Sequence, residues 1–224
     1  MLPALAHVED WIFDLDNCLY PASTNLFALI DIRMGEYIQR LLACDPAEAR
    51  VVQKRHFLEH GTTLAGLMRS HDVSPREFLD FVHDIDLARI TADPILVAAM
   101  DRLPGRKFVF TNASDDYAAR VLDRLGLANA FDGMHDIHAM AYQPKPNPEA
   151  YAAMCARHGI EPRRALFVDD MARNLAPAKA LGMVTVWLDN GSERGGHDAD
   201  PDSIDFVASS LGEWLEEILG EEVE

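Results

Sequence analysis

Residues Val8 to Tyr20 read VEDWIFDLDNCLY, and the interpretation of the whole chain starts from them. The apolar run Trp11-Ile12-Phe13 leads directly into Asp14-Leu15-Asp16, which is typical of a buried strand at the point where it ends. Alternate residues of an extended segment share a face, so Asp14 and Asp16 point the same way. Two neighbouring carboxylates repel unless one is protonated or a cation such as Mg²⁺ lies between them. The alternative is an ordinary Asx-type turn after a strand.

The composition indicates a folded protein with a large acidic excess. The 224 residues are enough for one large domain or for a core domain with a smaller insertion. The formal net charge of −17 repels phosphate backbones and anionic membranes, which makes nucleic-acid polymers and membranes poor candidate partners. A small anionic substrate is compatible with this charge if a metal and a few cations reverse the field locally.

The cysteines and the first residues favour a cytoplasmic location. Cys18, Cys44 and Cys155 are far apart in the sequence and form no CxxC pair, which favours reduced thiols over a disulfide framework or a zinc knuckle. The opening MLPALAHVEDW has no basic segment of the kind that begins a signal peptide. No stretch approaches the ~18 apolar residues of a membrane span.

From Pro21 to Leu103 the pattern is helical. Apolar residues recur three and four positions apart between Leu26 and Leu41, which predicts an amphipathic helix ending near Cys44. Further helices are predicted over 46–61, 63–69, 75–83 and 94–103. Because no strand pattern interrupts them, these helices are interpreted as an insertion after the first strand.

From Arg106 strands and helices alternate. The predicted strands cover 107–110, 131–138, 165–168, 183–188 and 204–207, and the predicted helices cover 114–126, 147–159, 172–182 and a terminal segment from 210. The Gly- and Asp-rich stretch 190–202 is predicted to be an exposed mobile loop. Such alternation predicts a parallel sheet covered by helices on both faces, with ligands at the carboxyl ends of the strands.

The second strand ends in Thr111-Asn112-Ala113-Ser114, directly before a helix. A hydroxyl, a side-chain amide and backbone N–H groups at a helix N-terminus form a cradle for an anion. Ser114 as an ordinary helix cap is the alternative interpretation.

A lysine lies between two prolines in the stretch QPKPNP, residues 143–148. The prolines restrict the backbone around Lys145, which suits a lysine that holds one position against a phosphate or carboxylates. The alternative is a Pro-rich surface turn with a solvated lysine.

The strand predicted over 165–168 runs into Asp169-Asp170, with Asn174 shortly after. Adjacent acids at a buried strand end are unfavourable unless they are paired or bind a cation. The spacing of Asp170 and Asn174 also predicts a hydrogen bond between them. A helix-capping Asp pair is the alternative.

Taken in order, these stretches resemble the four motifs of the haloacid dehalogenase superfamily of phosphohydrolases. The motif DxDx(T/V) is similar to residues 14–18, the strand-terminal Thr or Ser to Thr111, the motif lysine to Lys145, and the acidic pair to Asp169-Asp170. The likeness extends from Val8 to about Leu188. It departs at Cys18, where the family has Thr or Val, which puts one supporting hydrogen bond in doubt.

The resemblance implies an α/β fold with a three-layer, Rossmann-like parallel sheet. The implied core domain comprises residues 1–20 and 95–224, and an all-helical C1-type cap is inserted over 21–94. A cap that closes over the site excludes water and touches the leaving group, so it would select the substrate.

The resemblance also implies a Mg²⁺-dependent phosphomonoester hydrolase. Asp14 is then the nucleophile that forms an aspartyl-phosphate, and Asp16 is the general acid and base. The implied phosphoryl-binding residues are Thr111, Asn112 and Lys145, and the implied Mg²⁺ ligands are Asp14, Asp169, Asp170 and the backbone carbonyl of Asp16.

Within the superfamily, the stretches DLDNCLY, TNA, PKP and VDDMARN look like the pyrimidine 5′-nucleotidase branch. The resemblance places the cap segment Thr62 to Leu67 near the substrate, which makes Thr62 and Thr63 candidate substrate-binding residues. A simple helix start after Gly61 is the alternative for these threonines.

Other functions share parts of this pattern. Sugar-phosphate phosphatases share this type of cap, and a phosphomutase uses the same four motifs. A dehalogenase is not expected to carry both Asp16 and the Asp169-Asp170 pair, and a binding protein could have lost the nucleophile. The stretch His56 to His60 matches the H-x-x-E-H pattern of zinc proteases, but it is interpreted as a solvated helix face. The oligomeric state is left open.

Overall fold

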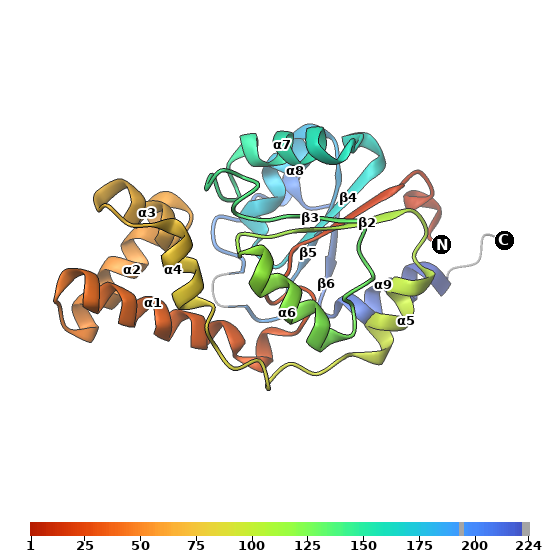
Figure 1. The fold of residues 1–224 in the computed structure, drawn as a ribbon. Helices are drawn as coiled ribbons and strands as arrows, with labels where there is room; N and C mark the ends of the chain where they lie inside the picture. The colour runs from red at the N-terminus through yellow and green to blue at the C-terminus, as the bar shows by residue number, and fades with distance from the viewer. Residues whose placement is uncertain (193–194, 221–224) are drawn as a thin grey trace.

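The computed structural model describes residues 1–192 and 195–220, and a parallel sheet lies at its centre (Figure 1). Within these residues the sheet has six strands in the order β3-β2-β1-β4-β5-β6, and all neighbouring pairs are parallel. The strands are β1 (Asp10–Phe13), β2 (Arg106–Phe110), β3 (Gly133–His135), β4 (Ala165–Asp169), β5 (Val184–Leu188) and β6 (Phe206–Ala208). The predicted α/β class and parallel sheet are therefore confirmed.

Strand β1 is one of the two middle strands of the sheet, and the order of the strands along the chain reverses beside it. It pairs with β2 on one side and with β4 on the other. Every residue of β1 and β4 is buried, which explains the apolar runs over 11–13 in β1 and 165–168 in β4. A reversal of strand order opens a crevice at the carboxyl ends of the strands, and Asp14 follows β1 at this position.

Helices cover both faces of the sheet (Figure 1). One face carries α7 (Pro148–His158) and α8 (Leu175–Leu181), and the other carries α5 (Pro94–Arg102), α6 (Asp115–Leu125) and α9 (Leu211–Gly220). Helix α5 is the last helix of the predicted helical stretch. It packs against α9 and therefore lies with the helices that cover the sheet. The architecture is the expected three-layer core.

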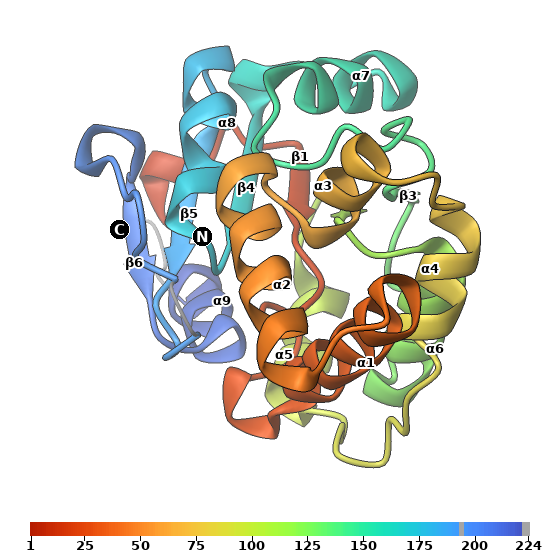
Figure 2. The same ribbon diagram turned by 90° about the vertical axis from the view of Figure 1, so that its left-hand side faces the viewer.

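Four helices form a separate group beyond the carboxyl ends of the strands (Figures 1 and 2). They are α1 (Leu26–Leu42), α2 (Pro46–His60), α3 (Thr63–Ser70) and α4 (Pro75–Val82). Local signals set their ends: Asp45 accepts hydrogen bonds from the backbone N–H groups of Ala47 and Glu48 at the start of α2, and Pro46 is the first helical residue. Contacts between α1 and α2, α2 and α3, and α1 and α4 hold the group together.

Some predicted elements differ from the structure. The helix predicted over 172–182 is split into a short 3₁₀ turn, Ala172–Asn174, and α8, because Pro177 cannot donate a hydrogen bond into a preceding helical turn. The strand predicted over 131–138 is only three residues long in β3. In the loop predicted over 190–202, residues 196–202 are exposed as expected, but Gly195 is buried and its carbonyl accepts a hydrogen bond from the Ala172 backbone. Residues 193–194 of that loop, and 221–224 of the terminal segment, lie outside the described residues.

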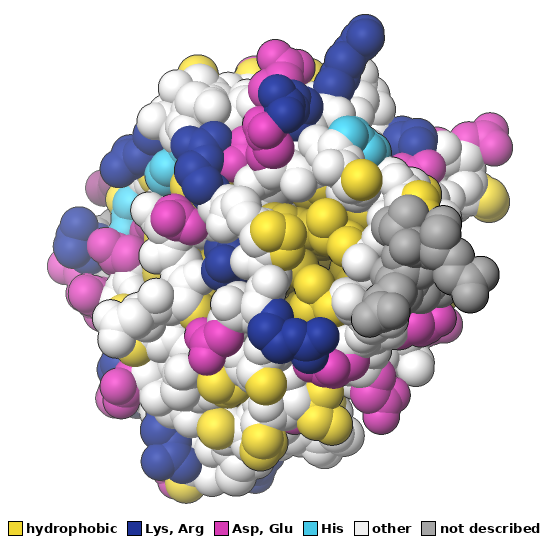
Figure 3. Space-filling model, turned by 90° about the vertical axis from the view of Figure 1, so that its right-hand side faces the viewer, with side chains coloured by type: hydrophobic (Ala, Val, Ile, Leu, Met, Phe, Trp, Pro, Cys, Tyr) yellow, Lys and Arg dark blue, Asp and Glu magenta, His cyan; other side chains and the backbone are white. Residues whose placement is uncertain are grey.

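The surface at the amino ends of the strands carries both signs of charge. Figure 3 shows acidic and basic side chains interspersed there, with hydrophobic side chains gathered in a hollow between them. Although the chain has a large acidic excess, this face is therefore not uniformly acidic. Among the described residues, no helix is long and apolar enough to cross a membrane.

Candidate active site

The structure brings Asp14, Lys145 and Asp169 together at the carboxyl ends of the central strands. The Lys145 Nζ lies 2.7 Å from Asp14 Oδ1 and 2.7 Å from Asp169 Oδ2. The lysine is 1% exposed, so the interpretation of a solvated surface lysine is wrong. Burial lowers the pKa of Lys145, but Asp14 and Asp169 more than reverse this effect and hold the ammonium group charged.

Asp169 is the most completely supported member of the group. Asn174 Nδ2 donates to both of its oxygens, at 2.9 and 3.0 Å, and the Met171 backbone N–H donates to Oδ1 at 2.8 Å. The prediction that Asn174 bonds Asp170 is therefore wrong. Because the segment after β4 turns as a 3₁₀ helix, Asn174 faces the preceding carboxylate instead.

Asp170 completes a buried acidic cluster with Asp14 and Asp169. Each of the three offers a carboxylate oxygen within 4.8 Å of the others. Burial and, to a smaller extent, the neighbouring Asp169 together raise the pKa of Asp170 to about 7. Burial also raises the pKa of Asp14 well above its usual range, although Lys145 opposes this. Three buried carboxylates against one ammonium group leave negative charge that a divalent cation would offset, and all-oxygen donors suit Mg²⁺.

Asp16 lies beside this cluster with its side chain partly exposed. Its Oδ1 accepts hydrogen bonds from two tyrosine hydroxyls, Tyr20 at 2.5 Å and Tyr117 at 2.9 Å. Burial raises the pKa of Asp16, while both tyrosine hydrogen bonds lower it. The sequence predicted no contact between Asp16 and either tyrosine: Tyr20 closes the stretch DLDNCLY, and Tyr117 carries no local signal.

Thr111 and Asn112 reach the same edge of the sheet from β2. The Thr111 side chain is buried, and its Oγ1 accepts a hydrogen bond from the Ala113 backbone N–H at 3.0 Å. The Asn112 amide pairs with the backbone of Lys145 in both directions, at 2.8 and 3.2 Å. Asn112 therefore holds the lysine loop, residues 143–148, in place, and its contact with a phosphoryl group stays a prediction.

Thr62 and Thr63 lie at the start of α3. Thr62 is the N-cap of this helix and accepts a hydrogen bond from the Ala65 backbone at 3.1 Å, while Thr63 is buried. The expected helix start after Gly61 is confirmed, whereas substrate binding by the two threonines stays a prediction.

A cleft of about 640 Å³ separates the end of α2 and α3 from the lysine loop. Gly61, Pro144 and Pro146 border it next to Lys145. Its charged lining is mixed, with Arg69 and Arg173 beside Glu59 and Asp198. Arg173 Nη2 donates to the Gly61 carbonyl at 3.2 Å, which ties the helical group to the core.

His56 is not on a solvated helix face, contrary to the sequence interpretation. It is 2% exposed and packs directly against Gly66 of α3, with its ring stacked near that of His60 at 5.8 Å. In the described part of the chain, neither group of possible metal ligands includes either histidine.

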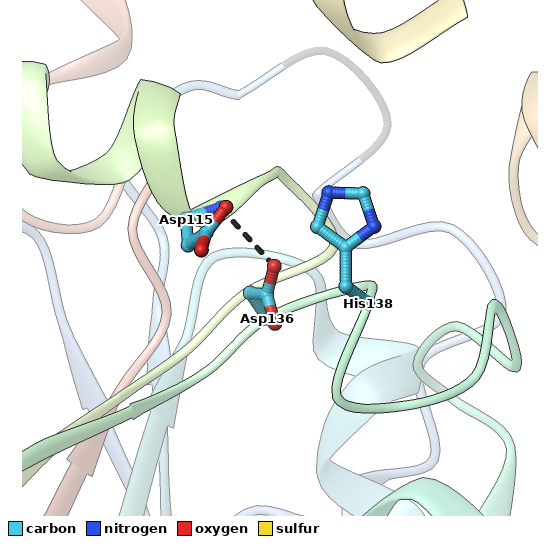
Figure 4. Close-up of side chains that lie close together, drawn as sticks. All are labelled: Asp115, Asp136 and His138. Atoms are coloured by element: carbon cyan, nitrogen blue, oxygen red, sulfur yellow. Dashed lines mark hydrogen bonds between the residues drawn. The ribbon is translucent and has the colours of Figure 1, made fainter. Parts of the chain in front are cut away.

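A second group of possible ligands comprises Asp115, Asp136 and His138 (Figure 4). Asp136 already serves a structural purpose, because its Oδ2 accepts from the Asp115 backbone N–H at 3.1 Å and its Oδ1 from Ala139 at 2.9 Å. Asp136 thus caps α6 from a neighbouring loop. Ser114 is the N-cap residue of α6, as predicted, but its side chain makes no cap hydrogen bond, and its Oγ lies 2.9 Å from His83 Nδ1 instead.

The sheet order and the residues at its carboxyl ends define a hydrolase of the haloacid dehalogenase type. The family model for haloacid dehalogenase-like hydrolases matches residues 12–182, which include Asp14, Lys145 and Asp169-Asp170. The chain therefore belongs to this family.

Relatives support the family without naming one activity. The chain is 24% identical over 189 residues to phosphate metabolism protein 8 of Saccharomyces cerevisiae, covering 77% of this chain and 59% of the yeast protein. It is 25% identical over 223 residues to phosphoglycolate phosphatase of Mesorhizobium japonicum, covering 91% and 95%. The fold matches the crystal structure of a HAD phosphatase from Thermococcus onnurineus with a TM-score of 0.64 at 20% identity, covering 96% and 99%.

Proposed function

We propose that the protein is a Mg²⁺-dependent phosphomonoester hydrolase that acts through an aspartyl-phosphate. The supporting observation is the contact of Lys145 Nζ with both Asp14 and Asp169 inside a buried cluster of three carboxylates. This arrangement suits a site that must bring an anionic nucleophile against an anionic phosphate. The relatives named phosphatases support the same reaction class.

Asp14 attacks phosphorus, and the bond from phosphorus to the leaving oxygen breaks. Asp16 donates a proton to that oxygen and then takes one from the water that hydrolyses the intermediate. Thr111, Asn112 and Lys145 bind the phosphoryl oxygens. Asp14, Asp169, Asp170 and the Asp16 carbonyl would hold Mg²⁺, which supplies charge neutralisation when it is bound.

We propose that residues 21–94, with α1 to α4, form a cap over a core made of residues 1–20 and 95–224. The hydrogen bond from Arg173 to the Gly61 carbonyl and the cleft between α3 and the lysine loop support this division. A cap in this position contacts the leaving group and excludes water.

Nucleoside 5′-monophosphates, in particular the pyrimidine nucleotides, are the proposed substrates. Phosphoglycolate is a second candidate, favoured by the relative of that name. Sugar phosphates and a mutase reaction are the further alternatives.

The test is phosphate release from UMP, CMP, AMP, phosphoglycolate and sugar phosphates, with Mg²⁺ or EDTA. Mg²⁺-dependent release that Asp14→Asn abolishes supports the mechanism, and the fastest ester identifies the substrate class. Full activity of Asp14→Asn would refute the aspartyl-phosphate. Conversion of a sugar phosphate to its isomer, without phosphate release, would identify a mutase.

The role of the α3 threonines needs a variant that keeps the helix cap. Thr62→Ser retains the hydroxyl that accepts from Ala65, whereas Thr62→Val and Thr63→Val remove hydroxyls. A changed preference between UMP and phosphoglycolate in the valine variants alone supports substrate binding. An unchanged preference removes this role.

A further inference from the structure

We propose that Tyr20 and Tyr117 are positioning residues that hold the Asp16 carboxyl by one oxygen and leave the other free for proton transfer. This inference rests on the proposed role of Asp16 as general acid and base. It assigns a task to two buried hydroxyls that the proposed chemistry of the cluster does not otherwise use.

Both tyrosines reach the same oxygen atom. Tyr20 Oη lies 2.5 Å and Tyr117 Oη 2.9 Å from Asp16 Oδ1, and the two hydroxyls are 3.5 Å apart. Across residues 1–192 and 195–220, these are the hydrogen bonds that reach the Asp16 carboxyl, and none goes to Oδ2. A carboxyl held twice at Oδ1 cannot rotate without breaking both bonds, so Oδ2 keeps a constant direction.

The two hydroxyls are held from different parts of the fold. Tyr20 follows β1 and is 2% exposed, whereas Tyr117 belongs to α6 and is 0% exposed. The Tyr117 ring is stacked on His83 at 4.3 Å with an interplanar angle of 15°, and His83 is fixed in turn by its contact with Ser114. Buried rings in this packing have few alternative rotamers, so the hydroxyls are preorganised.

The chemistry needs such a restraint because the Asp16 side chain is partly exposed. In the first step, the electron pair of the broken phosphorus–oxygen bond goes to the leaving oxygen, which receives the proton from Asp16 Oδ2. In the second step, Asp16 Oδ2 takes a proton from the water whose oxygen attacks phosphorus. The bond from phosphorus to the Asp14 oxygen breaks, and its electron pair returns to the Asp14 carboxylate. Proton transfer requires hydrogen-bond distance between Oδ2 and the leaving oxygen or the water. A carboxyl that turns freely would hold Oδ2 at this distance for a smaller fraction of the time.

The test compares Tyr20→Phe and Tyr117→Phe with Tyr37→Phe, which removes the hydroxyl of a tyrosine in the aromatic packing of the helical group. The readout is kcat/KM for the best alkyl phosphate and for p-nitrophenyl phosphate, whose leaving group needs no proton. We expect the alkyl ester to lose about 10- to 100-fold in each site variant and the aryl ester less than about 3-fold, because general acid catalysis contributes on the order of 10²–10⁴. Tyr37→Phe should retain both rates.

Equal losses on the two esters would overturn the proposal, because they would show general damage to the fold. Crystal structures of the two site variants give a second readout that does not depend on activity. Rotation or multiple conformers of Asp16 support the proposal, and an unchanged carboxyl in the double variant overturns it. A wild-type protein that hydrolyses no ester would refute the proposed function, while the crystal structures would still decide whether the tyrosines position Asp16.

Discussion

The Nζ atom of Lys145 lies 2.7 Å from Oδ1 of Asp14, in a site from which solvent is almost excluded. The same ammonium group contacts Asp169 at the same distance, so one cation joins the nucleophile to a proposed metal ligand. Breaking a buried ion pair on one side leaves uncompensated charge, which costs far more than an exposed pair contributes.

Lys145→Met should lower the free energy of unfolding by about 3–5 kcal/mol in EDTA, because Asp14 and Asp169 lose their cation. Phosphate release should fall by at least about 100-fold. Urea denaturation and ester hydrolysis measure the two effects. The matched control is Lys179→Met, which removes a half-exposed pair with Asp205 and should cost less than about 1 kcal/mol. A Lys145→Met protein as stable as the control would contradict the ion-pair argument.

Mg²⁺ should raise the thermal unfolding midpoint of the wild-type protein, because a cation that binds the folded acidic cluster stabilises it by mass action. Asp170→Asn should raise the midpoint in EDTA, since it removes one of three crowded carboxylates, and should reduce the shift that Mg²⁺ produces. Differential scanning fluorimetry over a Mg²⁺ series measures both. A full Mg²⁺ shift in Asp170→Asn would exclude this residue from the metal site.

Asp136→Ala should destabilise the protein by about 2 kcal/mol, because two backbone N–H groups lose their acceptor, including the one at the start of α6. The shift produced by Mg²⁺ should stay at the wild-type value. Thermal unfolding with and without Mg²⁺ separates these effects. A reduced Mg²⁺ shift would instead identify Asp115, Asp136 and His138 as a metal site.

Gly66→Ala should cost about 3 kcal/mol of stability, because the added Cβ would lie 2.3 Å from the buried His56 ring. Gly35→Ala is the matched control in α1, where the nearest atom lies 4.0 Å away, and it should stabilise the protein by about 0.5–1 kcal/mol. Chemical denaturation of both variants tests the packing of the helical group. Equal stabilities would show that α2 and α3 do not pack this closely.

The buried His135 should make the protein less stable in acid. Its ring is 1% exposed, and burial lowers its pKa from 6.5 to about 4. Below pH 6.5 the His135 ring is protonated in the unfolded chain but stays neutral in the folded protein. The free energy of unfolding therefore falls as the pH drops towards 4. Over this pH range the contribution of His135 to the free energy of unfolding falls by up to about 3 kcal/mol.

Comparison of His135→Phe with the wild-type protein isolates this contribution. The variant should lose less stability between pH 6.5 and 4, as measured by urea denaturation at several pH values. His7→Phe replaces an exposed histidine and should retain the wild-type pH dependence. A wild-type slope in His135→Phe would show that other groups carry the acid sensitivity.

The sequence was sufficient for the order of the elements and for most of the proposed catalytic residues. Continuous apolar runs such as Trp11-Ile12-Phe13 predict buried parallel strands, because helices cover both faces of such a sheet. The carboxyl ends of parallel strands meet at one edge. Asp14, Lys145 and Asp169 could therefore be placed together even though the first and the last are 155 positions apart in the sequence.

Tertiary structure alone decided which side chains touch. The hydroxyl of Tyr117 bonds Asp16 across 101 positions, and Asn174 bonds Asp169 and not Asp170. At the start of α6 the Asp136 carboxylate, and not the Ser114 side chain, accepts the hydrogen bond from the backbone. Periodicity and local spacing describe neighbours along one segment. Contacts between segments depend on how helices and loops pack in three dimensions, and for that reason the support around Asp16, and the burial of His56, carried no signal in the sequence.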